Sequence, residues 1–377
     1  MTTQRPESTL LRKITIIGVL LLFTAFTSAP QPVHAETIAT SARYGMAAGG
    51  ELAYQPPQKL ATYMQNIKNV GVERVRFDID WDAIQFKGPD FYDWSGYDPM
   101  VNAAAAAGLK VTAVITHTPK WARAPECVNV SSRCRPIDPA AFARFSGIAA
   151  KRYAPKGVHD WEIWNEPNLS ALWLPAVDPV AYADFLKQAS TEIRKNDPKA
   201  LILVGGLTHT FTNNGNSSPA DFLRTIYERG AGNSFDVVAV HPYTYPFVPS
   251  YTGEPTGWKS LKDARQVIVD HGQPDKKIWI TEFGAPTGGP KRQATSGTTR
   301  TALGSDHVTE ALNKRILEEA TQFVQNNTWI DVFFWYSYQD KNSRDHSSTE
   351  NFYGLVRSDG SHKPSYDAFR QAIMTSR

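Results

Sequence analysis

Two glutamates end apolar segments that stand more than a hundred residues apart. Glu166 belongs to WEIWNEPN (161–168), and Glu282 belongs to WITEF (279–283). Proline cannot donate a hydrogen bond to a sheet, so Pro167 should end a strand just after Glu166. A carboxyl group buried at a strand end is costly unless it is paired or takes part in chemistry. Two such groups facing each other across a cleft are what hydrolysis of a glycosidic bond requires.

That chemistry needs two carboxyl groups in different protonation states. One must carry a proton to release the leaving oxygen, and the other must be ionised to attack or to activate water. Burial among the indoles of Trp161, Trp164 and Trp173 would favour a neutral acid. Hydrogen bonds from Tyr243 and Arg76 would favour a charged nucleophile.

Alternating strands and helices predict how the two glutamates come together. Apolar runs such as LILV and VVAV are typical of parallel strands buried on both faces. Eight strands, each followed by a helix, predict a single-domain α/β fold, a (β/α)₈ TIM barrel over residues 44–377. The expected strands are 44–49, 72–81, 110–119, 159–168, 200–207, 235–246, 277–286 and 329–340; the expected helices are 56–71, 100–108, 139–153, 180–195, 219–229, 261–271, 307–326 and 364–373.

An open doubly wound sheet is the alternative to a closed barrel. It would require a phosphate-binding glycine turn after a strand, for which Gly205-Gly206 is a weak candidate. In a barrel the chemistry lies at the carboxyl ends of the strands. The fourth and seventh strands lie across the barrel mouth, so Glu166 and Glu282 can face each other. Other candidate site residues at strand ends are Arg76, His117, Asn165, His241, Tyr243 and Trp335.

The second expected strand carries three charged residues on one face. Alternation along VERVRFDIDW places Arg76, Asp78 and Asp80 on the same side. We interpret the two aspartates as structural, bonding Arg76 and the loop backbone. A metal site is the alternative, but no calcium-loop glycine spacing accompanies them.

The motifs at the strand ends resemble those of glycoside hydrolase clan A. The resemblance is carried by W-E-I-W-N-E-P (161–167), H-P-Y (241–243) and I-T-E-F-G (280–284), with support from R-F-D-I-D-W (76–81), T-P-K-W-A (118–122) and F-W-Y (334–336). Within the clan the chain most resembles family 39 and its relatives that degrade bacterial exopolysaccharides. Family 5, which shares most of these positions, is second. The resemblance runs from about Tyr44 to the C-terminus.

The resemblance implies a role for each matched residue. Glu166 matches the acid/base and Glu282 the nucleophile of a retaining mechanism that passes through a covalent glycosyl-enzyme. Asn165 matches the amide that bonds the sugar 2-hydroxyl. Tyr243 matches a residue that hydrogen-bonds the nucleophile, and Arg76 one that braces it.

Four further positions have weaker support. His117 and His241 match polar wall positions, although either histidine taken alone would more often be structural. Trp335 matches the aromatic floor under the cleaved sugar. Trp121, like Trp173 and Tyr245, would either stack on sugar or simply pack in the core.

The resemblance implies a hydrolase that needs no cofactor or metal. We expect an oligo- or polysaccharide substrate that the enzyme cleaves within the chain. The alternative is exo action of the β-xylosidase kind. A non-catalytic carbohydrate-binding barrel is a remote third possibility, because such a protein would be expected to have lost one carboxylate. We expect a monomer.

Residues 1–35 have the layout of a secretory signal peptide. A basic leader precedes the apolar stretch 14–26, and cleavage is expected after Ala35. The apolar stretch is short for a membrane anchor, which is the alternative, so no membrane insertion is expected after cleavage. The expected location is secreted, periplasmic or at the cell surface, and residues 36–43 are expected to form a flexible start.

The charge balance of the chain argues against nucleic acid as a partner. Losing the leader removes three basic residues and one acidic residue, so the net charge falls from +3 to +1. The two cysteines, Cys127 and Cys134, are expected to form a disulfide in an exported protein. Zinc is the alternative, but no further His or Cys ligands stand nearby.

Overall fold

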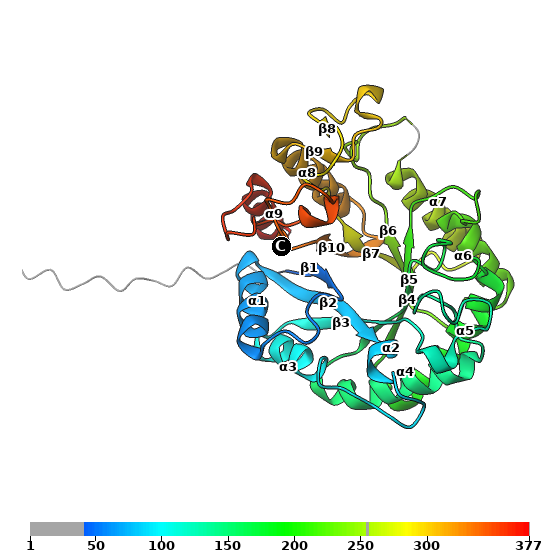
Figure 1. Cartoon of the computed structure of the whole chain (residues 1–377). Helices are drawn as coiled ribbons and strands as arrows, with labels where there is room; N and C mark the ends of the chain where they lie inside the picture. The colour runs from blue at the N-terminus through cyan, green and yellow to red at the C-terminus, as the bar shows by residue number, and fades with distance from the viewer. Residues whose placement is uncertain (1–40, 254–255, 377) are drawn as a thin grey trace, which may run out of the picture. The chain divides into compact units, whose positions relative to one another are not determined.

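Eight parallel strands close into a barrel in the computed structural model, which describes residues 41–253 and 256–376 (Figure 1). The predicted leader therefore lies outside the described residues. The barrel strands are β1 (Ser41–Gly49), β2 (Val72–Asp80), β3 (Lys110–Thr116), β4 (Asp160–Asn165), β5 (Leu201–Thr208), β6 (Val237–His241), β7 (Lys277–Phe283) and β10 (Ile330–Tyr336). They pair in chain order, and β10 closes the ring against β1. The predicted (β/α)₈ barrel is confirmed.

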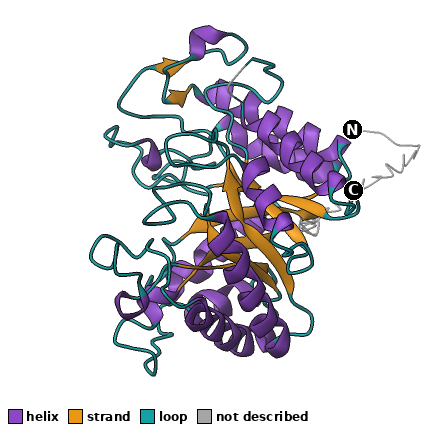
Figure 2. Cartoon of the chain, turned by 90° about the vertical axis from the view of Figure 1, so that its right-hand side faces the viewer, coloured by secondary structure: helices purple, strands orange, loops and turns teal. Residues whose placement is uncertain are grey.

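Helices surround the strands (Figures 1 and 2). The long ones are α1 (Pro57–Val70), α3 (Asp98–Ala106), α4 (Pro139–Tyr153), α5 (Pro179–Asn196), α6 (Pro219–Glu228), α7 (Gly257–Asp270), α8 (Glu310–Asn326) and α9 (Pro364–Thr375). Three of them begin with proline directly after a capping side chain, namely Asp138, Asp178 or Ser218. Proline fits the first helical turn because a backbone N–H at that position would have no acceptor within the helix. The preceding side chain accepts a hydrogen bond from one of the other free N–H groups.

Short elements lie in the loops between these units. They are α2 (Trp81–Ile84), η1 (Lys120–Ala122), η2 (Ala154–Lys156), η3 (Arg300–Ala302), η4 (Thr349–Asn351) and the paired strands β8 (Gln293–Ala294) and β9 (His307–Val308). The last pair shortens the helix expected at 307–326. Thr309 caps α8 with its side chain, so the helix begins at Glu310.

The start of the barrel differs from the prediction. Residues 41–43 were expected in a flexible segment, but they belong to β1, so that prediction is wrong for these three residues. One guanidinium nitrogen of Arg43 donates to the carbonyl oxygens of Val324, Asn327 and Ile330, at distances of 2.6 to 3.1 Å. These bonds join the first strand to the end of α8 and the start of β10.

The core has two parts, as expected for a barrel inside a ring of helices. A small cluster includes Leu203, Ala239, Trp279 and Phe334. A much larger cluster packs the strands against the helices. In the described part of the chain, no helix has both the length and the apolar character needed to cross a bilayer.

Cys127 and Cys134 form a disulfide, as the sequence predicted, with their Cα atoms 5.6 Å apart. The bridge closes a short loop in the segment between η1 and α4. Ala124 and Leu174 pack against the disulfide.

Replacing both cysteines with serine should lower the free energy of unfolding by about 2–3 kcal/mol, because the unfolded chain regains the freedom of the closed loop. Denaturant unfolding of the double variant and of the oxidised and reduced parent protein measures this. The reduced parent should match the double variant. Equal stability of the oxidised and reduced parent would contradict the prediction.

Candidate active site

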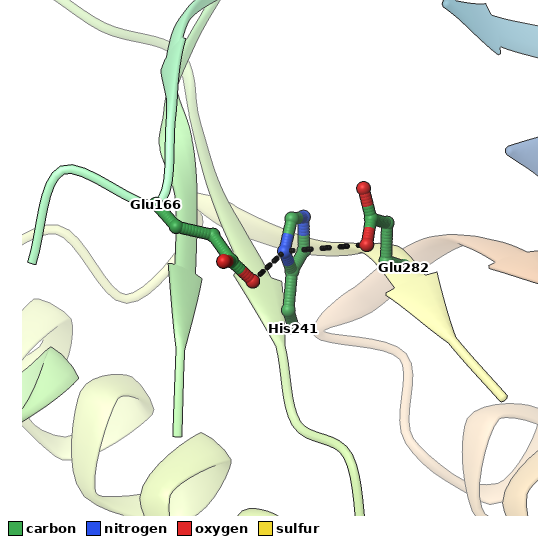
Figure 3. Close-up of side chains that lie close together, drawn as sticks. All are labelled: Glu166, His241 and Glu282. Carbon is green, nitrogen blue, oxygen red and sulfur yellow. Dashed lines mark hydrogen bonds and ion pairs between the residues drawn. The ribbon is translucent and has the colours of Figure 1, made fainter. Parts of the chain in front are cut away.

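Glu166, His241 and Glu282 meet at the carboxyl ends of β4, β6 and β7 (Figure 3). The imidazole Nδ1 of His241 lies 2.8 Å from Oε1 of Glu166 and 3.7 Å from Oε2 of Glu282. One oxygen of each glutamate and a ring nitrogen of His241 all lie within 4.8 Å of one another. The two carboxyl groups that the sequence singled out therefore belong to one site.

The backbone of β4 is irregular where it delivers Glu166. Trp164 and Glu166 have positive φ angles of 71° and 51°. A Cβ on Gly205 would stand 2.5 Å from two backbone oxygens of β4, and one on Gly206 would stand 2.0 Å from Nε2 of His241. The glycine pair, which the sequence offered only as a weak phosphate turn, instead makes room for β4 and for the histidine.

Both oxygens of Glu282 accept a hydrogen bond. Arg76 donates from Nη1 to Oε1 at 2.6 Å, and the Tyr243 hydroxyl donates to Oε2 at 2.9 Å. These are the two partners that the sequence proposed. Burial alone would raise the pKa of Glu282, but the nearby His241, the Arg76 charge and both hydrogen bonds outweigh it and lower the pKa. Glu282 is thereby held as a carboxylate.

Arg76 is fully buried and joins three strands. Its Nε and Nη2 donate to the two oxygens of Glu162 at 2.8 and 2.9 Å, and Nη2 also donates to Oδ1 of Asn165 at 2.8 Å. Because the side-chain oxygen of Asn165 accepts this hydrogen bond, its NH₂ group can donate to a ligand. Glu162, which also accepts from the backbone N–H of Gly206, was missed as a site residue. Its signal was a second glutamate, set between the apolar Trp161 and Ile163 of the strand.

His241 is fully buried between the two glutamates. Burial by itself lowers its pKa, but the charge of Glu282 and the hydrogen bond to Glu166 outweigh that effect and raise the pKa above the ordinary value. Nδ1 faces both glutamates, so a proton on this nitrogen can be donated to Glu166. The other nitrogen, Nε2, lies 3.0 Å from the Thr281 hydroxyl.

Asn165, Glu166, Tyr243 and Glu282 open onto a cavity of about 520 Å³. It is lined by Gly49, Asp78, Asn165, Glu166, Thr208, Tyr243, Tyr245, Glu282, Tyr336, Glu350 and Tyr353. The hydroxyl of Tyr353 donates to that of Tyr245 at 2.8 Å across one wall. The sequence left Tyr245 open between packing and sugar stacking, and the structure places it in the wall. Six lining residues were not predicted as site residues: Gly49, Asp78, Thr208, Tyr336, Glu350 and Tyr353.

The predicted role of Trp335 as the aromatic floor is wrong. Its side chain is fully buried and packs against Phe283, with ring centroids 6.2 Å apart. The next residue, Tyr336, lines the cavity instead. Successive side chains of a strand point to opposite faces, so the F-W-Y motif was read one residue out of register.

Four other predicted residues do not line the cavity: Arg76 and His241 are buried behind the glutamates, and Trp121 and His117 make other contacts. Trp121 donates from its indole nitrogen to the Gln85 carbonyl at 2.7 Å and stays 38% exposed. The Nδ1 of His117 lies 2.8 Å from Asp80, a carboxylate that also accepts from the backbone N–H of Ala83 at 3.2 Å. The structural interpretation is thus confirmed for Asp80 in its bond to backbone. The side-chain bonds of Arg76 go to Glu162, Asn165 and Glu282, so the expected bonds from the two aspartates to Arg76 are wrong. Burial lowers the pKa of His117, but the hydrogen bond and charge of Asp80 reverse this and raise it.

The three indoles near Glu166 do not form the expected apolar wall around it. Trp161 donates to Asp197 at 3.0 Å, and Trp164 packs edge-on against Trp173 with centroids 5.2 Å apart. All three are buried and none lines the cavity. The hydrogen-bond partner of Glu166 is His241 instead.

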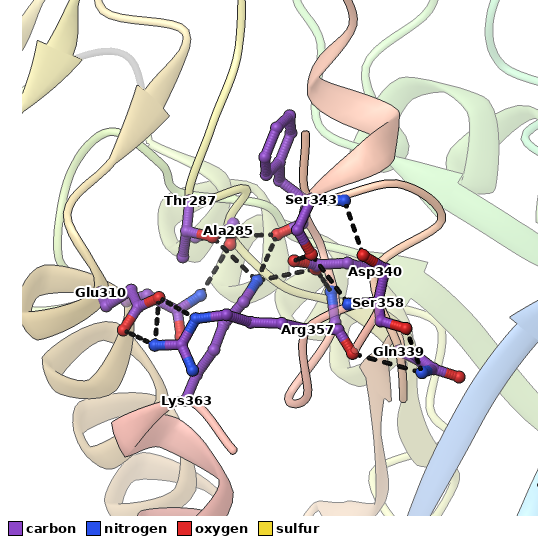
Figure 4. Close-up of polar contacts among 12 residues, drawn as sticks. Ala285, Thr287, Glu310, Gln339, Asp340, Ser343, Arg357, Ser358 and Lys363 are labelled. Atoms are coloured by element: carbon purple, nitrogen blue, oxygen red, sulfur yellow. Dashed lines mark hydrogen bonds and ion pairs between the residues drawn. The ribbon is translucent and has the colours of Figure 1, made fainter. Parts of the chain in front are cut away.

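A buried polar network supports the wall that carries Tyr353 (Figure 4). The Lys363 ammonium donates to Asp340 at 2.7 Å, to the Thr287 hydroxyl at 2.8 Å and to the Phe352 carbonyl at 3.0 Å. Lys363 and Asp340 are almost fully buried. This one cation therefore ties the loops after β7 and β10 to the start of α9.

The cluster of Glu166, His241 and Glu282 also has the residue types of a metal site. Both Glu282 oxygens, however, are already bonded to Arg76 and Tyr243. A guanidinium 2.6 Å from a carboxylate opposes a second cation there, and His241 favours a proton on the nitrogen that faces the glutamates. The arrangement fits a hydrogen-bonded carboxyl pair better than a metal centre.

The family model of cellulase (glycosyl hydrolase family 5) matches residues 34–339. The chain belongs to this family. Clan A, which the sequence motifs predicted, is thereby shown, and family 5 is the second of the two families that they favoured.

Solved structures of both families resemble the chain. A family 39 glycoside hydrolase from Bacteroides cellulosilyticus WH2 has a TM-score of 0.67 and 22% identity, covering 89% of this chain and 64% of that one. A GH5_18 protein from Streptomyces cattleya, in complex with GlcNAc, has a TM-score of 0.65 and 17% identity, covering 90% and 81%. At these identities the likeness shows the fold.

Among curated proteins, a beta-amylase of Vigna unguiculata is 29% identical over 123 residues. That match covers 30% of this chain and 24% of the beta-amylase. The chain thus matches about a quarter of the length of that relative and 64% of the family 39 chain.

Gly206→Ala should cut the activity at least about 100-fold, because a Cβ there would displace His241 by overlap with its ring. The activity is measured as kcat/KM on whichever glycoside the parent hydrolyses best. Gly360→Ala, in an exposed turn with a φ of 86° and no atom near the added Cβ, is the control for a strained glycine substitution that leaves the site intact. Unchanged kcat/KM in Gly206→Ala would contradict this account of the glycine.

Lys363→Met should lower the free energy of unfolding by about 3–5 kcal/mol, because it leaves Asp340 buried without its cation. Adding Asp340→Leu should restore part of that loss, since no buried charge then lacks a partner. Urea unfolding of the single and double variants measures both. A single variant as stable as the parent would show that the network is dispensable.

Proposed function

We propose that the protein is a secreted retaining glycoside hydrolase that cleaves O-glycosidic bonds of a microbial extracellular or cell-wall polysaccharide, acting within the chain. The observation that carries the reaction type is the placement of Glu166 and Glu282 around one imidazole, within 4.8 Å. Retaining enzymes hold their carboxyl groups about 5–5.5 Å apart, whereas inverting enzymes leave about 6.5–9.5 Å for a water. With one oxygen of each carboxyl group within 4.8 Å of the other, the pair is nearer the retaining than the inverting spacing, which supports retention.

Glu282 is the nucleophile in this proposal. Arg76 and Tyr243 hold both of its oxygens and favour the carboxylate. Its attack on the anomeric carbon forms a glycosyl ester as the bond to the leaving oxygen breaks. The same two donors fix its position, so little rearrangement is needed at the moment of attack.

Glu166 is the acid/base. It gives its proton to the leaving oxygen in the first step and takes one from water in the second, when water breaks the ester. His241, which donates to Glu166, holds its carboxyl group towards the cavity. The Asn165 NH₂ group, turned outward by Arg76, is suited to bond the sugar 2-hydroxyl.

Export and substrate class rest on the sequence. The leader at residues 1–35 and the disulfide support work outside the cytoplasm, and the resemblance to exopolysaccharide-degrading enzymes supports the polymer. In solution we expect a monomer.

Exo action is favoured by one feature of the cavity. Lys341 forms ion pairs with Glu51 and with Glu350, the latter at 3.5 Å, and Tyr336 donates to Glu350 at 3.1 Å. These contacts join the loops after β1 and β10 beside Glu350 and Tyr336, which line the cavity. A blind pocket bounded by such a bridge would suit an enzyme that trims single sugars, such as a β-xylosidase.

Glu282→Ala and Glu166→Ala should each lower kcat at least about 10⁴-fold on an unactivated substrate, since each removes one half of the carboxyl pair. Added azide should restore the activity of both variants on an activated aryl glycoside. NMR of the glycosyl azide should show inverted configuration from Glu282→Ala and retained configuration from Glu166→Ala. Wild-type turnover in Glu282→Ala, or the reverse pair of configurations, would contradict the assignment.

Tyr243→Phe should move the acidic limb of the kcat/KM profile to higher pH. The hydroxyl stabilises the charged form of Glu282, so its loss raises the pKa of that group and the carboxylate forms only at higher pH. Tyr353→Phe is the control, because its hydroxyl bonds Tyr245 and not Glu282. An acidic limb that stays in place in Tyr243→Phe would count against Glu282 as the ionised partner.

The product profile on a panel of polysaccharides separates the modes of action. An endo-acting enzyme gives a ladder of oligosaccharides at early times, and an exo-acting one gives monosaccharide alone. Chromatography of the digests measures this. A ladder is expected; monosaccharide alone would replace the proposal with the exo alternative, and the absence of any product from every polymer and aryl glycoside would reject both.

A further inference from the structure

Asp78 is a carboxyl group of the cavity that the two-carboxylate mechanism does not use. It lies near the end of β2, two residues beyond Arg76 on the same face of the strand. It is partly buried and lines the same cavity as Glu166 and Glu282. One of its oxygens lies close to Gly50, where an added Cβ would approach to 3.3 Å.

The other carboxyl groups of the cavity all have a basic partner. Glu166 is bonded to His241, Glu282 to Arg76, and Glu350 pairs with Lys341. In residues 41–253 and 256–376, by contrast, no hydrogen bond or ion pair reaches the carboxyl group of Asp78. Asp80, two residues further on, is also paired, with His117.

The surroundings of Asp78 make its charge costly. Burial raises its pKa to about 6, and although Arg76 and His117 act to lower it, Asp80 and Glu282 add to the rise. A carboxylate in this position gains most from a ligand that brings hydrogen-bond donors. Sugar hydroxyl and ammonium groups are such donors.

The charge of the cavity wall limits what can bind there. No lysine or arginine is among the residues that line the cavity in the described part of the chain. A sugar carboxylate beside Asp78 would thus find no lysine or arginine among these lining residues to neutralise it. Like charges at close range in a partly buried site repel strongly.

We propose that Asp78 determines specificity by accepting hydrogen bonds from two donors of the sugar at the cleavage site, and that it excludes uronic acids from this position. The donors are two hydroxyl groups of a neutral sugar, or a hydroxyl and an ammonium group of an amino sugar. The inference rests on the proposed glycosidase function and adds the class of sugar: neutral or cationic, not anionic.

The test compares Asp78→Asn with the parent on 4-nitrophenyl β-glycosides and cellobiosides. The panel contains matched pairs, glucoside with glucuronide and galactoside with galacturonide, together with the glucosaminide and xyloside. For the parent, we expect kcat/KM on the neutral member of a pair to exceed that on the uronide at least about 100-fold. For Asp78→Asn, kcat/KM on the neutral or amino substrate should fall at least about 10-fold, mainly because KM rises. On the uronide, kcat/KM should stay the same or rise.

Asp359→Asn, which removes one negative charge from an exposed turn, is the control and should leave both values unchanged. Melting curves show whether each variant is folded. If Asp78→Asn does not fold, the parent still tests the proposal: its preference for the neutral sugar should shrink as pH falls through about 6. The charged and titratable groups that face Asp78 are Arg76, Asp80, His117 and Glu282.

The outcomes distinguish a failure of the proposed glycosidase function from a failure of the proposed role of Asp78. If the parent hydrolyses none of these glycosides and no polysaccharide, the proposed function fails and this inference fails with it. If the parent hydrolyses them but Asp78→Asn keeps the same preference, or the parent cleaves the uronide as well as its neutral partner, only the role of Asp78 is overturned. A preference that stays flat between pH 5 and 7.5 would also overturn it.

Discussion

The buried Arg76 guanidinium holds the site together. It bonds Glu162 and Asn165 on β4 and Glu282 on β7, so one cation fixes three side chains from opposite sides of the barrel. A buried charge is tolerated only when its partners satisfy it, and here two carboxylates and an amide do so. The same contacts keep Glu282 ionised and turn the Asn165 NH₂ group towards the cavity. Stability and chemistry therefore depend on the same set of bonds.

His241 links the second carboxyl group to this arrangement. The imidazole fits between the glutamates because Gly206 leaves the space that a Cβ would occupy. Gly205 likewise accommodates the irregular backbone of β4, where Trp164 and Glu166 adopt positive φ angles. Strained backbone at a strand end is often found where a side chain must be aimed. The packing of β4 on β5 thus decides where Glu166 lies.

Periodicity and strand-end motifs were enough to predict the barrel and the pairing of Glu166 with Glu282. Apolar strands, proline starts and capping residues are local signals, and chain order in a barrel converts them into positions around the mouth. Trp335 shows the limit: a single residue of register decides which of two neighbouring aromatics faces the cavity, and composition does not fix it. Strand alternation placed Asp78 beside Arg76, but it was interpreted as structural because the sequence does not show which carboxyl groups are paired. Tyr353 was missed because it lies in the loop after β10, whose path the sequence does not fix.

The central claim is that Glu282 forms a covalent bond to the sugar. Incubation with a 2,4-dinitrophenyl 2-deoxy-2-fluoro-β-glycoside, whose slow second step lets the ester accumulate, tests it directly. Mass spectrometry of the intact protein and its peptides should show one added fluorosugar, carried on the peptide that contains Glu282. A label on another residue, or release of one dinitrophenol per turnover with inverted sugar and no label, would contradict the account.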